Sequence, residues 1–316
     1  MRTRKLGNTE LELTTLGLGT WAIGGPWQYG WGAQDDADSV KTILAAIDGG
    51  INWIDTAPIY GCGHSETIAG QAIKQLKQKP LIATKCSLLW NDKREKYSCL
   101  DAKSIIKECE DSLKRLGIET IDLYQMHWAN PPEQIEEGWE AMAACVKQGK
   151  VRYIGVSNFS VDQLERIGKL HPVASLQPPY SMLRRDVEKE LLPYCAKNKI
   201  GVVAYSPMQK GLLTGKITKA FMQTLAADDH RRNDPDFNGP GLERNLKLID
   251  ALRPIAQRNG KTLAQLAIAW VLRRKEVTAA IVGARKPAQI QETLPAGDWN
   301  LTDKDIAEVE TILKKM

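Results

Sequence analysis

Long hydrophobic runs are missing from this chain of 316 residues. No apolar stretch approaches the roughly 18–20 residues that a membrane-spanning helix needs. The basic N-terminus, Met1 to Lys5, is followed by an alternating polar and apolar segment, with no apolar signal core and no cleavage site. We therefore expect a cytoplasmic protein with no membrane partner.

Blocks of basic residues and paired cysteines are missing as well. The formal net charge is only +5. The absence of any run of about 5–8 lysines and arginines argues against a nucleic-acid partner. The six cysteines contain no CxxC pair, so we expect reduced thiols and no metal site. A mild positive charge is compatible with an anionic cofactor but does not require one.

What the chain does contain is a regular alternation of short apolar segments and helical patterns. Strands are expected at residues 15–20, 51–54, 80–86, 121–126, 151–156, 173–176, 200–205 and 277–282. Helices are expected at residues 38–49, 65–77, 101–116, 132–147, 160–170, 186–198, 242–258, 262–274, 287–294 and 302–315. A short hairpin is expected at residues 4–13, around Gly7 and Asn8.

Eight strands separated by helices favour an α/β fold of the (β/α)8 TIM-barrel type, with extra C-terminal helices and a single domain spanning residues 1–316. The competing arrangement is a doubly wound sheet. No G-x-G-x-x-G motif stands between a strand and a helix, so a dinucleotide-binding fold of that kind loses its main support.

Ionisable residues follow three consecutive strands of the expected barrel. Asp55 ends the second strand and Tyr60 lies in the loop after it, Lys85 is near the end of the third, and His127 follows the fourth. In a barrel these ends meet at one rim. A tyrosine with a pKa of about 10 is a poor acid, and a nearby ammonium lowers that pKa. Singly, each residue has a structural alternative: Asp55 as a cap, Lys85 and His127 as solvated groups, Tyr60 as a rim aromatic.

The sequence resembles the aldo-keto reductase family over essentially its whole length. The resemblance rests on six segments: 52–61 (NWIDTAPIYG), 82–85 (IATK), 121–127 (IDLYQMH), 155–159 (GVSNF), 204–207 (AYSP) and 281–285 (IVGAR). It implies that Asp55, Tyr60, Lys85 and His127 form the catalytic tetrad, with Tyr60 as the proton donor. It also implies that the N-terminal hairpin plugs the far end of the barrel.

The same resemblance implies a nicotinamide site. Tyr205, with Ser206 and Pro207 after it, is similar to the aromatic that stacks on the nicotinamide ring. Ser157, Asn158 and Gln177 are similar to the groups that bind its carboxamide. From the residues alone, Ser157 and Asn158 would more often form a turn or a helix cap.

A basic segment after the last strand is similar to the family's site for the adenosine 2′-phosphate. Arg285 can clamp a phosphate, and Lys286 adds charge. The expected contacts are Gly283, Ala284, Arg285, Gln289 and Glu292. The segment favours NADPH and NADP+ over NADH, although basic residues also occur as solvated rim charges. The long insertion at 208–241 resembles a loop that folds over the cofactor pyrophosphate, through Gly211, Leu212, Lys216 and Arg231.

Tryptophans in the rim loops are expected to line the substrate pocket: Trp21, Trp27, Trp31, Trp90 and Trp128. The sequences of several motifs resemble those of bacterial members of the family that act on small aldehydes and polyols such as glyceraldehyde. We therefore predict NADPH-dependent reduction of aldehydes or ketones. Two alternatives stay open: a Schiff-base lyase that uses Lys85, and a non-catalytic regulatory subunit that binds NADPH.

Overall fold

The computed structural model describes residues 1–315, so the last residue of the expected domain, 316, lies outside the described residues. All eight expected strands form one closed parallel barrel. In chain order they are β3 (Leu16–Gly19), β4 (Trp53–Asp55), β5 (Leu81–Cys86), β8 (Ile121–Met126), β9 (Val151–Ser157), β10 (Ser175–Gln177), β11 (Gly201–Ala204) and β12 (Val277–Gly283). The barrel closes where β12 pairs with β3. The (β/α)8 prediction is confirmed.

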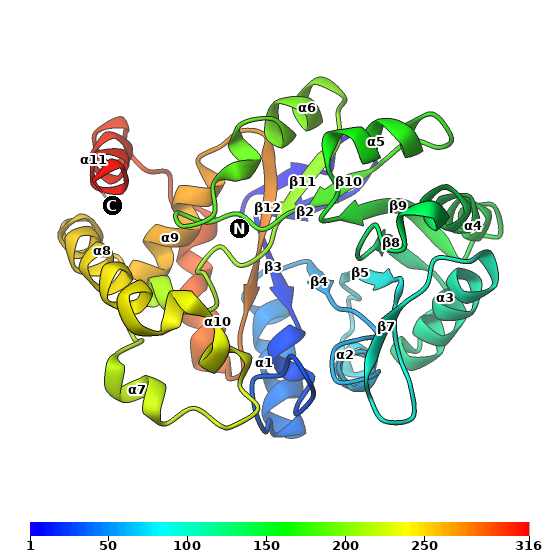
Figure 1. Cartoon of the computed structure of the whole chain (residues 1–316), viewed down its shortest axis with the longest axis horizontal. Coiled ribbons are helices and arrows are strands. Elements are labelled where there is room, and N and C mark those ends of the chain that lie inside the picture. Colours follow the sequence, from blue (N-terminus) through cyan, green and yellow to red (C-terminus); the bar gives the residue numbers. More distant parts are fainter. Residues whose placement is uncertain (316) are drawn as a thin grey trace.

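Helices surround the ring of strands in Figure 1. The first six are α1 (Asp36–Asp48), α2 (His64–Gln75), α3 (Ala102–Leu116), α4 (Ile135–Lys147), α5 (Val161–Gly168) and α6 (Leu191–Lys197). The C-terminal group, yellow to red in Figure 1, comprises α8 (Gly239–Arg258), α9 (Leu263–Leu272), α10 (Pro287–Thr293) and α11 (Asp303–Lys314). Every residue of α9 is buried, because this helix packs against both α8 and β12.

Local sequence signals account for several helix ends. The Asp101 carboxylate accepts a hydrogen bond of 2.8 Å from the Ser104 N–H and caps α3, which ends at Gly117 in the left-handed region (φ +65°). Ser160 and Gln163 form a capping box at the start of α5. These caps satisfy backbone groups that a helix end leaves without partners.

The hairpin at the N-terminus pairs β1 (Thr3–Lys5) with β2 (Glu12–Thr14), as expected. Leu6, Leu11 and Leu13 are buried against inward-facing side chains of the barrel, including Trp53. The hairpin therefore plugs the barrel at the end opposite the carboxyl ends of the strands. A side chain at Gly17 would overlap the Trp53 indole, since its Cβ would lie 2.1 Å from the ring.

Three details differ from expectation. The helix expected at 186–198 is divided: a short 3-10 turn covers 186–188, and α6 begins at Leu191, which places Pro193 in the first turn, where its missing N–H is tolerated. A second hairpin, β6 (Leu88–Trp90) with β7 (Lys96–Ser98), follows β5, and the long insertion contains the short helix α7 (Lys219–Gln223). No helix within residues 1–315 is both long and apolar enough to cross a membrane.

Candidate active site

The carboxyl ends of β4 and β5 bring three of the predicted catalytic groups together. The fully buried Lys85 ammonium donates to Asp55 Oδ1 at 2.6 Å and to the Thr56 carbonyl at 2.9 Å. It also lies 3.4 Å from the Tyr60 hydroxyl. β4 and β5 are neighbours in the barrel, and their register pairs Asp55 with Ala83, so that Lys85, two residues further along β5, lies on the same side of the strand as the Asp55 partner. The sequence therefore builds a chain of hydrogen bonds from carboxylate to ammonium to phenol.

The pKa of Tyr60 differs from the expected one. Burial of the phenol, followed by the negative charge of Asp55, raises its pKa well above 10. The pKa is therefore shifted in the direction opposite to the expected one, and the largest cause is burial of the phenol. Burial lowers the pKa of Lys85, while Asp55 acts in the opposite direction. At neutral pH Tyr60 is therefore a protonated phenol, the form that can donate a proton.

His127 completes the set from the end of β8. Its ring meets that of Tyr60 edge to face, with 5.9 Å between the ring centres. Burial, and after it the positive charges of Lys85 and Lys96, hold the pKa of His127 well below 6.5, so the imidazole is neutral at physiological pH. Its Nδ1 has no hydrogen-bond partner among residues 1–315. A neutral imidazole at the cavity wall is suited to hydrogen-bond a substrate oxygen.

The groups expected to bind the nicotinamide lie beside the tetrad and bond to one another. The Tyr205 hydroxyl donates to Asn158 Oδ1 at 2.9 Å, and Asn158 Nδ2 donates to Ser157 Oγ at 2.9 Å. Gln177 Nε2 donates to Asp55 Oδ2 at 2.8 Å. The Gln177 amide oxygen accepts no bond from the described residues, which leaves an acceptor for a carboxamide N–H.

A single cavity of about 740 Å³ joins these groups to the outer rim. Of the predicted site residues it is lined by Asp55, Tyr60, His127, Ser157, Asn158, Gln177, Tyr205, Ser206, Pro207, Gly211, Lys216, Arg231, Gly283, Ala284, Arg285, Gln289, Glu292, Trp21, Trp27, Trp31 and Trp128. Three predicted residues are not in its wall. Lys85 lies behind Tyr60, Leu212 belongs to the hydrophobic core, and Trp90 is on β6, where it packs beside Leu88.

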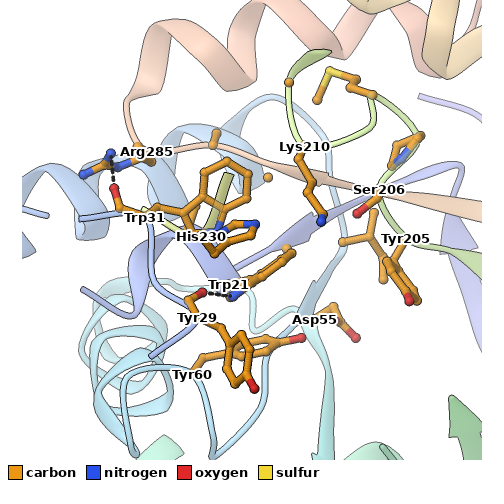
Figure 2. Close-up of a pocket in the computed structure, with 18 of the residues that line it drawn as sticks. Trp21, Tyr29, Trp31, Asp55, Tyr60, Tyr205, Ser206, Lys210, His230 and Arg285 are labelled. Atoms are coloured by element: carbon orange, nitrogen blue, oxygen red, sulfur yellow. Dashed lines mark hydrogen bonds between the residues drawn. The ribbon is translucent and has the colours of Figure 1, made fainter. Parts of the chain in front are cut away.

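The aromatic wall is a stacked column. Trp21 stacks on Tyr60, with 6.4 Å between ring centres, and on His230, with 4.8 Å. Figure 2 shows the Trp21 ring between the other two. The loop after β4 is held close to this wall, since a Cβ at Gly61 would lie 1.9 Å from the Gly24 carbonyl oxygen. Glycine at 61, with φ +66°, permits that approach.

The insertion after β11 meets the 21–34 loop across the cavity, and the two segments lie together in Figure 1. His230 Nδ1 donates to the Gly30 carbonyl at 3.0 Å. The Arg231 guanidinium lies over the Trp31 ring at 4.5 Å and forms a salt bridge with Asp229 at 2.6 Å. Lys216 pairs with Glu292, so two of the predicted cofactor residues neutralise each other.

Sequence reasoning missed several residues of the cavity wall: Tyr29, Lys210, Phe221 and His230 among them. Lys210 extends toward the cavity from the loop after β11 (Figure 2) and is paired with Asp234 at 2.7 Å. Lys210 directly precedes Gly211, a predicted cofactor residue, and this position could have indicated that Lys210 lies at the cavity. Phe221 and His230 lie in the irregular insertion, where no periodicity shows which side chains face inward.

The geometry places the chain in the class of parallel-barrel enzymes whose ionisable residues gather at the carboxyl ends of the strands. Comparison with known proteins is more specific. Residues 15–314 match the model of the Aldo/keto reductase family. The chain therefore belongs to the aldo/keto reductase family, whose members are oxidoreductases that use nicotinamide cofactors.

Three relatives illustrate the range within the family. Aldo-keto reductase YhdN of Bacillus subtilis is 40% identical, over 99% of this chain and 94% of its own. The NADH-specific methylglyoxal reductase of Escherichia coli is 36% identical, over 100% and 98%. The structure of the glycerol dehydrogenase AKR11B4 from Gluconobacter oxydans superposes with a TM-score of 0.90 at 40% identity, covering 99% of this chain and 95% of that one.

Proposed function

We propose that this protein reduces small aldehydes or ketones to alcohols with NADPH, and that Tyr60 is the proton donor. The observation that carries the proposal is the hydrogen-bonded series Asp55–Lys85–Tyr60, of which Asp55 and Tyr60 line the cavity. Tyr60, His127 and Tyr205 would face a carbonyl group together. We further propose that residues 1–316 act as one catalytic domain, and a cytoplasmic location stays a prediction.

The residues of the cavity fit a nicotinamide dinucleotide. Tyr205 offers a ring face, Gln177 an amide oxygen, and Arg285 a cation at the far end of the same cavity. A bound nicotinamide supplies the hydride for the carbonyl carbon. Arg285 and Lys286 support NADPH over NADH, because both can attract a 2′-phosphate. One relative is NADH-specific, so the preference for NADPH over NADH has to be measured.

Proton transfer from Tyr60 to the reduced oxygen is downhill. An alkoxide is a much stronger base than a phenolate, so even a phenol whose pKa is raised by burial protonates it. His127, held neutral by its lowered pKa, hydrogen-bonds the carbonyl oxygen and orients it toward Tyr60. Lys85 stabilises the phenolate that remains. In the oxidative direction Tyr60 must lose its proton first, which favours alkaline pH.

Substrate size is suggested by the wall and by the relatives. Methylglyoxal and glycerol, named for two relatives, are small oxygenated compounds. The Trp21 and Trp31 rings and His230 cover the cavity beside Tyr60. We propose small aldehydes such as glyceraldehyde, and the corresponding polyols in the reverse direction.

The Schiff-base alternative has little structural support. A substrate carbon would have to reach Lys85 Nζ, which is fully buried, does not line the cavity and is already bonded to Asp55, Thr56 and Tyr60. A panel of aldehydes, with NADPH consumption followed by absorbance, tests the proposal. The proposal expects turnover by the wild type. Tight NADPH binding with no turnover of any aldehyde would instead favour the regulatory subunit.

A further inference from the structure

Arg285 is held by a loop that lies 251 residues away in the sequence. Its Nε donates to Gln34 Oε1 at 2.7 Å, its Nη1 donates to the Trp31 carbonyl at 3.0 Å, and its Nη2 donates to the Ala33 carbonyl. Figure 2 shows the side chain reaching toward Trp31. A guanidinium has five N–H groups, so two remain for a ligand. All three acceptors are uncharged.

The amide of Gln34 is itself oriented by its surroundings. Gln34 Nε2 donates to Ser39 Oγ and to the Arg285 carbonyl, both at 3.0 Å. The buried Ser39 hydroxyl donates in turn to the Asp35 carbonyl at 2.8 Å. The Arg285 carbonyl oxygen can only accept a hydrogen bond, so the NH2 group of Gln34 must point toward it. The amide oxygen of Gln34 therefore faces the Arg285 guanidinium. The start of α1 therefore fixes the position of the guanidinium.

The positive charge of Arg285 has no carboxylate partner among residues 1–315. Burial, and after it the charge of Arg231, lower the pKa of Arg285, but a guanidinium stays protonated in proteins. The nearby carboxylates serve other groups: Asp35 caps α1, Asp36 pairs with His64, Asp229 with Arg231 and Glu292 with Lys216. A half-buried cation without a counter-ion at the end of a cavity favours an anionic ligand.

We propose that Gln34 is a positioning residue that sets the cofactor specificity of this protein. Its uncharged amide holds Arg285 in place while leaving the positive charge and two N–H groups for the 2′-phosphate of NADPH. This inference rests on the proposed nucleotide site and adds the residue that determines how well the site discriminates. A carboxylate at position 34 would cancel the guanidinium charge, and it could not donate to the Arg285 carbonyl as the Gln34 amide does.

Two small nucleotides test the inference without turnover. Adenosine 2′,5′-bisphosphate and adenosine 5′-monophosphate differ only in the 2′-phosphate, and calorimetric titration gives a Kd for each with the full-length protein. The wild type is expected to prefer the bisphosphate, and Arg285→Ala to lose that preference. Gln34→Ala should weaken bisphosphate binding about 5- to 10-fold, the equivalent of one ordinary hydrogen bond, with the monophosphate within about twofold of wild type.

Two further variants separate charge from packing. Gln34→Glu is nearly isosteric and should weaken bisphosphate binding on the order of 100-fold, because the carboxylate neutralises Arg285. Ser39→Ala touches neither Arg285 nor the cavity, yet it should shift bisphosphate binding in the same direction as Gln34→Ala, by a smaller factor. Ser39→Ala and Gln34→Glu keep the inference testable if Gln34→Ala is poorly folded.

The possible failures are distinct. If Arg285→Ala loses the preference but Gln34→Ala binds the bisphosphate as well as the wild type or better, Gln34 does not prepare the site and the inference is wrong. An equal loss of both nucleotides in Gln34→Ala would also contradict it, since that pattern shows general packing. If the wild type and Arg285→Ala both lack any preference, the NADPH assignment itself fails.

Discussion

Replacing Asp55 by Asn should damage stability and turnover together. The carboxylate serves two sets of donors: Oδ1 accepts from Lys85 at 2.6 Å, and Oδ2 accepts from Gln177 Nε2 at 2.8 Å and Gln125 Nε2 at 3.4 Å. An asparagine has one oxygen and one NH2 group. In either orientation the NH2 group faces a hydrogen-bond donor, so either Lys85 or the two glutamines lose their acceptor. In both cases Lys85 loses its counter-ion.

The magnitude follows from the burial of the pair. Removing one partner of a buried ion pair costs about 3–5 kcal/mol, because the remaining charge is left without compensation. Lys85 is fully buried, and its pKa is already below 10.5 because of burial, although Asp55 opposes that effect. Without Asp55 the folded-state pKa of Lys85 falls further. Between that pKa and 10.5, Lys85 is protonated in the unfolded chain but neutral in the folded protein. The stability deficit is therefore present at neutral pH and shrinks as the pH rises toward 10.5.

Urea unfolding at several pH values, in parallel with NADPH-dependent turnover, measures both effects. Asp111→Asn is a matched control, since Asp111 forms an exposed pair with Lys107 that is worth only about 0.5 kcal/mol or less. A loss in Asp55→Asn no larger than that of the control would refute the reasoning. So would a deficit that grows with pH.

Two further predictions concern buried groups. Burial raises the pKa of Glu108 from 4.5 to about 8. The contribution of this group to the free energy of unfolding is therefore fully present below pH 4.5 and is lost as the pH rises through 8. In Glu108→Gln the side chain can still accept the hydrogen bond of 3.0 Å from the Ser87 N–H. This variant should be more stable than the wild type between pH 5 and 9, by up to a few kcal/mol. If urea unfolding shows no such gain, the raised pKa of Glu108 is contradicted. His127→Gln, which retains a neutral donor, should keep more reductase activity than His127→Ala, and the wild-type rate should show no step near pH 6.5 from His127. A pH–rate profile with that step, abolished in His127→Gln, would show that the imidazole titrates.

That Asp55, Tyr60, Lys85 and His127 lie close together could be predicted from sequence, because the topology of the barrel determines it. Asp55, Lys85 and His127 each follow a recognisable strand, and the barrel brings the ends of neighbouring strands to one rim. The eight strands were recognisable because buried parallel strands are short apolar runs between helical patterns. The raised pKa of Tyr60 was not predictable in the same way, since it depends on how deeply the phenol is buried and how close Asp55 lies.

Contacts between distant loops were beyond sequence reasoning. The bonds from Arg285 to Gln34 and Trp31 exist only because β12 closes the barrel beside β3 and so brings the loops after these two strands together. His230 lies in an irregular insertion whose path has no periodic signal. Trp90 was misplaced for a related reason: the β6–β7 hairpin, whose strands have three residues each, turns it away from the cavity.

We propose that the Tyr60 hydroxyl, held close to Lys85 and Asp55, delivers the proton. Tyr60→Phe removes that hydroxyl and leaves the ring that stacks near Trp21. The most direct measurement compares kcat for aldehyde reduction with the Kd for NADPH in wild type and Tyr60→Phe. We predict a fall in kcat of about 10²- to 10⁴-fold with an NADPH Kd within about twofold. Equal NADPH oxidation by the two proteins would contradict the account.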